Sequence, residues 1–283
     1  MSMAMAAPQI VTSIEELRVR VANWRGAGAR VGLVPTMGAL HAGHLALVGA
    51  SQSRCERTVV SIFVNPTQFA PHEDFDRYPR DLEADAAKLA DADLIFAPSA
   101  AEMYPDGFAT RIEVDGPSAG LETDFRPHFF PGVATVVAKL LIAALPDIAV
   151  FGEKDYQQLL VIRRLVADLA LPVEIVGAPV VREADGLALS SRNAYLSAEE
   201  RAVAGRLNVI LRDAAKKAGG GAEIAETEHK AVDSLLAAGF GSVDYVAIRD
   251  AETLAKIEKL SRPARILAAA KIGETRLIDN MAV

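Results

Sequence analysis

The stretch Val31–Val48, VGLVPTMGALHAGHLALV, is the strongest indication of the fold, because it combines the patterns of a buried strand, a turn and the start of a helix. Its first residues, with Leu33 and Val34 at their centre, have the short apolar pattern of a central strand. Pro35 is expected to end that strand, since it lacks a backbone donor. A strand that leads through a turn into a helix is the building unit of parallel α/β sheets.

Two histidines, His41 and His44, follow the turn at a helical spacing, among apolar residues that recur three and four apart. The first turn of a helix has unpaired N–H groups and the positive end of the helix dipole, and both attract an anion such as phosphate. Gly38 and Gly43 permit tight backbone geometry beside such a ligand. Taken alone, the pair of histidines also fits ordinary helix residues or half of a metal site.

Strand and helix patterns alternate over about 180 residues of the chain. A first helix is expected to begin near Thr12 or Ser13, since either can cap it. Further strands are expected at 58–64, 94–97, 148–151 and 173–176, and helices at 44–54, 81–90, 133–145 and 156–169. Because parallel strands need helical crossovers, this rhythm predicts an α/β fold with a doubly wound, Rossmann-like parallel sheet.

The pattern changes after about Arg182. Helices are expected at 198–217 and 222–238, separated by a flexible run of three glycines, and strands at 243–248 and 266–270. This predicts a second, smaller α+β domain, with the larger domain at 1–184 and the smaller, lid-like one at 185–283. A hinge at the junction could close the smaller domain over a bound nucleotide.

Composition excludes several classes of protein. The 283 residues are 51% hydrophobic with a net charge of −7, which argues against a general nucleic-acid binder. The first 24 residues show no basic segment followed by a long apolar one, and no window of 18 uncharged apolar residues occurs, so we expect no leader or membrane anchor. The single cysteine, Cys55, suits a reducing cytoplasm and receives no catalytic role. A Walker-type phosphate loop is absent, and the glycines of GAGARVG precede their strand rather than follow it.

The segment SIFVNPTQF places amide side chains where a strand ends. Ligands bind at this edge in open α/β sheets. Asn65 and Gln68 offer donors and acceptors that suit a substrate with hydroxyl and carboxylate groups. An ordinary loop remains the alternative for this segment by itself.

The segment VFGEKDYQQL has the same arrangement of strand, loop and helix. Lys154 is a mobile charge suited to phosphate oxygens. Asp155 could cap the following helix instead of binding a ligand. Gln158 lies one turn later, on the same side as Lys154 and Asp155, and could reach a substrate.

Two hydroxyls and a guanidinium follow each other in ALSSRN. Ser190, Ser191 and Arg192 could surround a polyphosphate, because hydroxyls donate and arginine binds two oxygens at once. The segment could also simply start the next helix. Ser197 with Glu200 makes a better cap there, which leaves SSRN with less structural reason to exist.

The sequence His41-Ala42-Gly43-His44 resembles the HxGH motif of nucleotidyltransferases, in which it holds ATP phosphates. With SIFVNPTQF, FGEKDYQQL and ALSSRN in this order and spacing, nearly the whole chain resembles the pantoate–β-alanine ligase family. The resemblance implies synthesis of pantothenate from ATP, pantoate and β-alanine through a pantoyl-adenylate, with release of AMP and pyrophosphate. It also implies Mg²⁺ as cofactor and a homodimer.

The family's roles can be carried over residue by residue. The implied ATP site consists of Met37, Gly38, Ala39, Leu40, His41, Ala42, Gly43, His44, Gly152, Glu153, Lys154, Asp155, Val181, Leu189, Ser190, Ser191 and Arg192. Pantoate and β-alanine would be held by Asn65, Gln68, Arg126 and Gln158. The implied catalytic residues are His41, His44, Lys154, Ser190, Ser191 and Arg192, with His44 as the proton donor.

The metal ligands remain unassigned by the sequence. Asp85 could be a carboxylate on the metal side, or part of a solvated helix face. One departure from the family concerns the run Arg126–Val133, RPHFFPGV, where the family typically reads RPGHFxGV. The histidine has moved by one place, so His128 receives no role here, while Arg126 keeps access to the cleft.

Two other functions explain less of the sequence than the ligase does. A sibling nucleotidyltransferase that transfers an adenylyl or cytidylyl group to a phosphate would share HxGH, but it does not explain NPTQF or GEKDYQQL. A nucleotide-binding regulator on the same fold would not need both histidines, Lys154 and Arg192 together.

Overall fold

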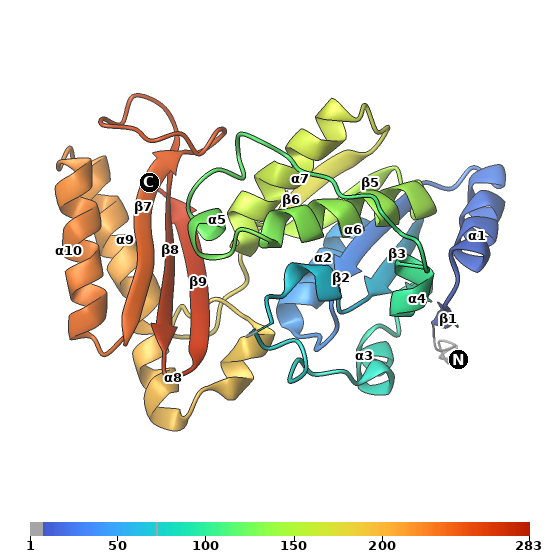
Figure 1. The fold of residues 1–283 in the computed structure, drawn as a ribbon, viewed down its shortest axis with the longest axis horizontal. Helices are drawn as coiled ribbons and strands as arrows, with labels where there is room; N and C mark the ends of the chain where they lie inside the picture. Colours follow the sequence, from blue (N-terminus) through green and yellow to red (C-terminus); the bar gives the residue numbers. More distant parts are fainter. Residues whose placement is uncertain (1–7, 72) are drawn as a thin grey trace.

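Six parallel strands form the larger sheet of this computed structural model, which describes residues 8–71 and 73–283 (Figure 1). Their spatial order is β1-β4-β3-β2-β5-β6. Strands β3 and β4 are therefore added on one side of β2, and β5 and β6 are added on its other side. The strands are β1 (Gln9–Val11), β2 (Val31–Thr36), β3 (Arg57–Ile62), β4 (Leu94–Phe96), β5 (Ile148–Gly152) and β6 (Glu174–Ala178).

Helices cover both faces of this sheet. Leu33 and Val34 are neighbours in β2, yet they belong to different hydrophobic clusters, because successive side chains of a strand point to opposite faces. The helices α1 (Ile14–Gly26), α6 (Phe129–Ala144) and α7 (Tyr156–Asp168) pack on the Leu33 face, and α2 (Ala42–Gln52) and α3 (Leu82–Lys88) pack on the Val34 face. The predicted doubly wound parallel sheet is confirmed.

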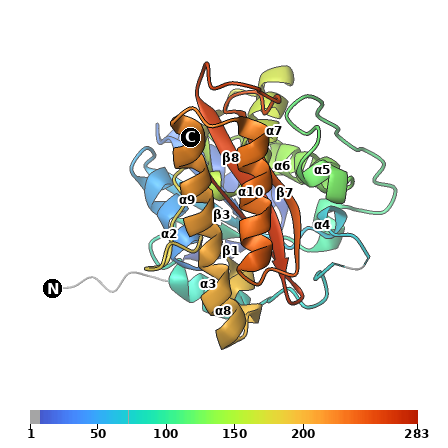
Figure 2. The ribbon, with the colours of Figure 1, turned by 90° about the vertical axis from the view of Figure 1, so that its left-hand side faces the viewer.

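The C-terminal part has an antiparallel sheet of three strands, in the order β7-β8-β9. These strands are β7 (Ser242–Asp250), β8 (Ala264–Ile272) and β9 (Thr275–Ala282). Helices α9 (Arg206–Gly219) and α10 (Ile224–Ala237) cover the sheet on the side away from the larger one, and Figure 2 shows them in front of it. This part has its own hydrophobic cluster, formed by residues from Leu187 onward. The predicted smaller α+β unit is therefore present.

Pro35 does not end its strand, contrary to expectation, since β2 continues to Thr36. The backbone donor that proline lacks would point toward β5, because Val31 bonds to Asp147 on that side and the direction alternates along the strand. Gly32 and Leu33 are the residues of β2 that pair with β5, so no ladder bond is lost at Pro35.

The helix expected at 198–217 is two helices. Helix α8 (Ala198–Ala204) ends at Gly205, and α9 begins directly after it. A Cβ on Gly205 would lie 2.5 Å from a carboxylate oxygen of Asp185, so the break brings the backbone against that side chain. Strands β1 and β9 were missed by the sequence interpretation, as were the short helices α4 (Ala100–Met103), α5 (Glu122–Phe125), η1 (Pro66–Gln68), η2 (Glu153–Asp155) and η3 (Ser191–Tyr195).

A small apolar cluster joins the two sheets. Leu121 and Leu160 of the N-terminal part pack there with Ala247, Leu254 and Leu267 of the C-terminal part. Within residues 8–71 and 73–283, every helix is too short or too polar to cross a membrane.

Candidate active site

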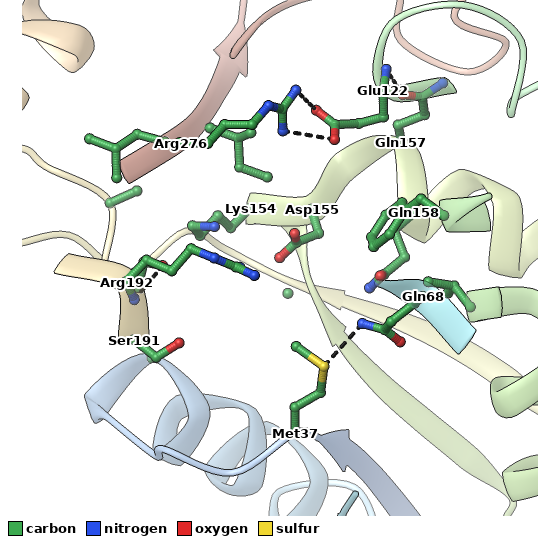
Figure 3. A pocket seen from close by; sticks show the side chains of 18 of the residues that line it. Met37, Gln68, Glu122, Lys154, Asp155, Gln157, Gln158, Ser191, Arg192 and Arg276 are labelled. Carbon is green, nitrogen blue, oxygen red and sulfur yellow. Dashed lines mark hydrogen bonds and ion pairs between the residues drawn. The ribbon is translucent and has the colours of Figure 1, made fainter. Parts of the chain in front are cut away.

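A cavity of about 610 Å³ lies between the two sheets, at the carboxyl ends of the parallel strands. Residues that follow β2, β3, β5 and β6 line it from one side, and residues of β8 and β9 line it from the other. Figure 3 shows Lys154, Asp155 and Arg192 together on one side of the cavity, with Gln68 and Gln158 on the other. The volume is that of a typical small-molecule site.

Most residues predicted from the sequence line this cavity. From the predicted ATP site these are Met37, His41, Gly43, His44, Gly152, Lys154, Asp155, Val181, Leu189, Ser190, Ser191 and Arg192. All four predicted substrate residues also line it, namely Asn65, Gln68, Arg126 and Gln158. Five others predicted for ATP are not among its lining residues, namely Gly38, Ala39, Leu40, Ala42 and Glu153.

The two histidines cap helix α2 with their own side chains. Nδ1 of His41 accepts from the backbone N–H of Gly43 at 3.1 Å, and Nδ1 of His44 accepts from the backbone N–H of His41 at 3.3 Å. A nitrogen that accepts an N–H carries no proton, so in each neutral ring the proton is on Nε2. The pair therefore offers two Nε2–H donors. The centres of the two imidazole rings lie 4.1 Å apart.

Burial and charge keep these rings neutral. Burial lowers the pKa of His44 to about 3, and the charges of His41 and Lys154 act in the same direction. The pKa of His41 is also lowered, by burial and then by Lys154 and Lys88. Protonating either Nδ1 would in addition break a helix cap, so both rings present neutral donors.

We expect the His44 ring to stay neutral down to about pH 4 in the ligand-free protein, followed by NMR titration of the histidine side chains. An unperturbed imidazole has a pKa of about 6.5, so below that pH the unfolded chain takes up a proton that folded His44 does not. The free energy of unfolding therefore falls as the pH drops from about 6.5 to about 3. Added pyrophosphate should raise the pKa of His44, because a nearby anion favours imidazolium. A His44 titration near pH 6 without ligand would contradict this geometry.

Gly43 is required between the histidines for steric reasons. A Cβ built on it would lie 2.8 Å from Cε1 and 2.9 Å from Nδ1 of His41. Any side chain at this position would push the His41 ring out of its capping position. This close approach explains the third letter of HxGH.

Asp85 holds the loop before the histidines. Its carboxylate is 2% exposed and accepts the backbone N–H groups of Ala39 and Leu40, each at 2.8 Å. Ala39 has a φ of +50°, a conformation that non-glycine residues rarely adopt. The interpretation of Asp85 as part of a solvated helix face was wrong, since its side chain is buried and both carboxylate oxygens accept backbone N–H groups.

The loop that carries Lys154 is anchored to the C-terminal sheet. Asn280 of β9 donates from Nδ2 to the carbonyl oxygens of Glu153 at 2.9 Å and Lys154 at 2.8 Å. The Glu153 carboxylate pairs with Arg265 at 3.0 Å, which explains why it does not line the cavity. The anchor uses only the backbone of Lys154, whose ammonium group faces the cavity (Figure 3).

The Asn65 side chain forms hydrogen bonds to other protein groups and orients Gln68. Its Oδ1 accepts from the Tyr104 hydroxyl at 2.7 Å and from the Thr67 hydroxyl at 2.9 Å, and its Nδ2 donates to Gln68 Oε1 at 3.1 Å and to the Gly132 carbonyl at 3.1 Å. Asn65 is 1% exposed. The Gln68 amide nitrogen is directed toward the sulfur of Met37, at 3.0 Å (Figure 3).

Arg126 lines the cavity but is paired. Its Nε and Nη2 donate to the two carboxylate oxygens of Glu73, both at 2.7 Å, and its guanidinium lies 4.0 Å from the ring centre of Phe129. Burial acts to raise the pKa of Glu73, but the hydrogen bonds and charge of Arg126 outweigh it, so this pKa is lowered. The displaced His128 precedes helix α6, with Nε2 3.8 Å from Glu73.

Each side chain of SSR has a protein partner. The Ser190 hydroxyl accepts the backbone N–H of Arg192 at 3.3 Å, and the Ser191 hydroxyl lies 3.2 Å from that of Tyr78. Arg192 forms an ion pair with Asp74, whose oxygens lie 2.9 and 3.0 Å from its nitrogens. The segment forms the short helix η3 and does not start α8, which has its own capping box from Ser197.

The site can therefore stabilise negative charge. Two neutral imidazole donors, an ammonium and a guanidinium converge on a cavity whose far side carries two amide side chains. Sequence reasoning missed Asp74 and the anchor Asn280, and it singled out Asp85 without foreseeing that this carboxylate holds the loop before the histidines. The acidic residues between NPTQF and YPR were the available signal for Asp74.

Comparisons with known proteins point to one family. The family model described as Pantoate-beta-alanine ligase matches residues 9–282. A pantothenate synthetase of Mesorhizobium japonicum is 59% identical over 281 residues, which cover 99% of each chain. One of Rhodospirillum rubrum is 57% identical, covering 99% of this chain and 100% of the other.

Solved structures give the same result. The pantothenate synthetase of Thermus thermophilus superposes with a TM-score of 0.91 at 50% identity, covering 96% of this chain and 98% of that one. A pantoate-beta-alanine ligase of Francisella tularensis, solved with Beta-gamma ATP and Beta-alanine, has a TM-score of 0.82 at 35% identity and 97% coverage of both chains.

Proposed function

This chain belongs to the pantoate-beta-alanine ligase family, and we propose that the cavity between its two sheets is the site of that family's reaction. The protein catalyses the ATP-dependent condensation of pantoate with β-alanine. The observation that carries the assignment of the site is the convergence of His41, His44, Lys154 and Arg192 on one cavity.

In the first step the pantoate carboxylate attacks the α-phosphorus of ATP, and pyrophosphate leaves. Negative charge accumulates on the phosphoryl oxygens during this step. The Nε2–H groups of His41 and His44 donate to these oxygens, while Lys154 and Arg192 balance the charge of the leaving pyrophosphate. A bound triphosphate raises the pKa of His44, so the ring can take up a second proton at Nδ1 in place of the cap on the His41 N–H. The resulting imidazolium can donate its Nε2 proton to the leaving pyrophosphate, the role implied by the family resemblance.

In the second step the amine of β-alanine attacks the carbonyl carbon of the pantoyl-adenylate, and AMP leaves. Gln68 and Gln158, on the side of the cavity opposite Lys154, hold pantoate through its hydroxyl and carboxylate groups. Asn65 supports this step by fixing the Gln68 amide. Confinement between the two sheets keeps water from the mixed anhydride.

The Mg²⁺ implied by the family fits this site as an ion carried by ATP. No group of three or more possible ligands occurs among the described residues, and Mg²⁺ often binds through substrate phosphates with one or two carboxylates. Asp155 lines the cavity and makes no hydrogen bond or ion pair with other described side chains, so it is the carboxylate we assign to the ion. Bound there, Mg²⁺ would neutralise charge on the triphosphate.

The reaction is tested with purified protein, ATP, Mg²⁺, pantoate and β-alanine, each omitted in turn. We expect equal amounts of AMP and pantothenate when all are present. With β-alanine omitted, labelled pyrophosphate should exchange into ATP only if pantoate is present, which diagnoses the adenylate. Pyrophosphate release that depends on another acceptor would instead support a sibling nucleotidyltransferase.

We also propose that residues 1–184 and 185–283 form two domains, the second acting as a lid. Their separate hydrophobic clusters support this division. At one edge, Asn280 ties β9 to the Lys154 loop. At another, the buried Glu122 pairs with Arg276 at 2.8 Å, a contact that an opening movement would have to break.

The homodimer and the cytoplasmic location are further proposals. Family resemblance supports the homodimer, and two exposed apolar residues near the end of α6, Ile142 and Leu145, are suited to its interface. Sedimentation equilibrium would test it. The single buried free cysteine, Cys55, supports a reducing compartment.

A further inference from the structure

A partly buried ion pair joins two segments that lie far apart in the sequence. Asp74 comes from the loop between η1 and α3, and Arg192 comes from η3. Nε of Arg192 donates to one carboxylate oxygen at 3.0 Å, and Nη2 donates to the other at 2.9 Å. Such a two-point contact fixes the plane and the direction of a guanidinium group.

The pair leaves one edge of the guanidinium for a ligand. No hydrogen bond or ion pair with the described residues engages Nη1 of Arg192. Figure 3 shows the Arg192 side chain reaching into the cavity beside Lys154 and facing Asp155. A triphosphate in the cavity would meet this unused edge, since Asp74 holds the opposite one.

The surrounding residues partly shield the pair from water. The side chains of Asp74 and Arg192 are 14% and 29% exposed, and the neighbouring Tyr78 is buried with its hydroxyl 3.2 Å from that of Ser191. Burial acts to lower the pKa of Arg192, but the hydrogen bonds and charge of Asp74 outweigh it, so this pKa is raised. Without Asp74, the guanidinium would lose the partner that fixes its direction.

We propose that Asp74 is a positioning residue for the triphosphate of ATP, because it holds the Arg192 guanidinium by two nitrogens and leaves Nη1 directed into the cavity. This inference rests on the proposed role of Arg192 in binding ATP. It adds a carboxylate, on the segment between NPTQF and YPR, that does not itself touch the phosphates.

The test is a double-mutant cycle of Asp74→Asn with Arg192→Lys. Asp74→Asn keeps the shape of the side chain and removes its charge. We expect it to raise the KM for ATP, and the dissociation constant of pyrophosphate, by on the order of tenfold, with a smaller change in the KM for pantoate. Lysine cannot make the two-point contact, so in the Arg192→Lys background the same change should have little further effect.

The matched control is Asp168→Asn. Asp168 pairs with Arg164 by the same two nitrogens, at 2.7 and 2.8 Å, but both lie exposed on helix α7 outside the cavity. This variant should leave the KM for ATP unchanged. Asp74→Glu keeps the charge and should recover part of the affinity, and it replaces Asp74→Asn in the cycle if that variant does not fold.

Two results would overturn the proposal. Tighter binding of pyrophosphate by Asp74→Asn would mean that Asp74 competes with phosphate for Arg192. An equal loss in both Arg192 backgrounds would mean that Asp74 only stabilises the fold. Pyrophosphate binding is measured without the full reaction, so it separates this inference from the proposed function, which depends on pantothenate formation by the wild-type protein.

Discussion

His44→Ala is expected to lower kcat by roughly 10²–10³-fold, the usual loss when one donor to a transition-state oxyanion is removed. The substitution removes the Nε2–H donor and also the cap on the His41 N–H at 3.3 Å. Because charge on the phosphoryl oxygens peaks in the transition state, the KM for ATP should change far less than kcat. Steady-state kinetics of pantothenate formation provide the measurement.

The control for this variant is His229→Ala. His229 lies on the exposed face of α10, where its nearest acidic partner is Asp233 at 3.6 Å, and it does not line the cavity. It should leave kcat unchanged. His44→Gln retains an amide N–H and should fall between His44→Ala and the wild type. A His44→Ala protein with nearly normal kcat would remove this residue from the mechanism.

Asp85→Ala is expected to lower the free energy of unfolding by roughly 2–4 kcal/mol, because two backbone N–H groups lose their acceptor. The loop should also relax from the unusual conformation at Ala39, which displaces the histidine cap that follows it. The KM for ATP should therefore rise as well. Urea unfolding measures the first effect, and steady-state kinetics measure the second.

Glu83→Ala on the same helix is the matched control. Glu83 is exposed and, among the described residues, makes no hydrogen bond or ion pair, so its loss should change the free energy of unfolding by less than about 0.5 kcal/mol. If Asp85→Ala and Glu83→Ala were equally stable, the hydrogen bonds from Ala39 and Leu40 would not hold the loop.

The larger sheet was predictable because its signals are local. Short apolar runs, a 3.6-residue period between them and caps such as Ser13 are written in consecutive residues. Pro35 was misjudged because whether a strand tolerates proline depends on which neighbour pairs with it. The break at Gly205 was missed for a similar reason, since it depends on contact with Asp185, twenty positions earlier in the chain.

The sequence was sufficient to predict which polar groups line the cavity, because the motifs that carry His41, His44, Lys154 and Arg192 each lie where an element begins or ends. How these groups are held depends on contacts that exist only in the folded chain. Asp85, Asp74 and Asn280 lie 45, 118 and 126 positions from the residues that they hold. Each makes its contact by packing between elements that no local pattern relates, so its role appears only once the chain is folded.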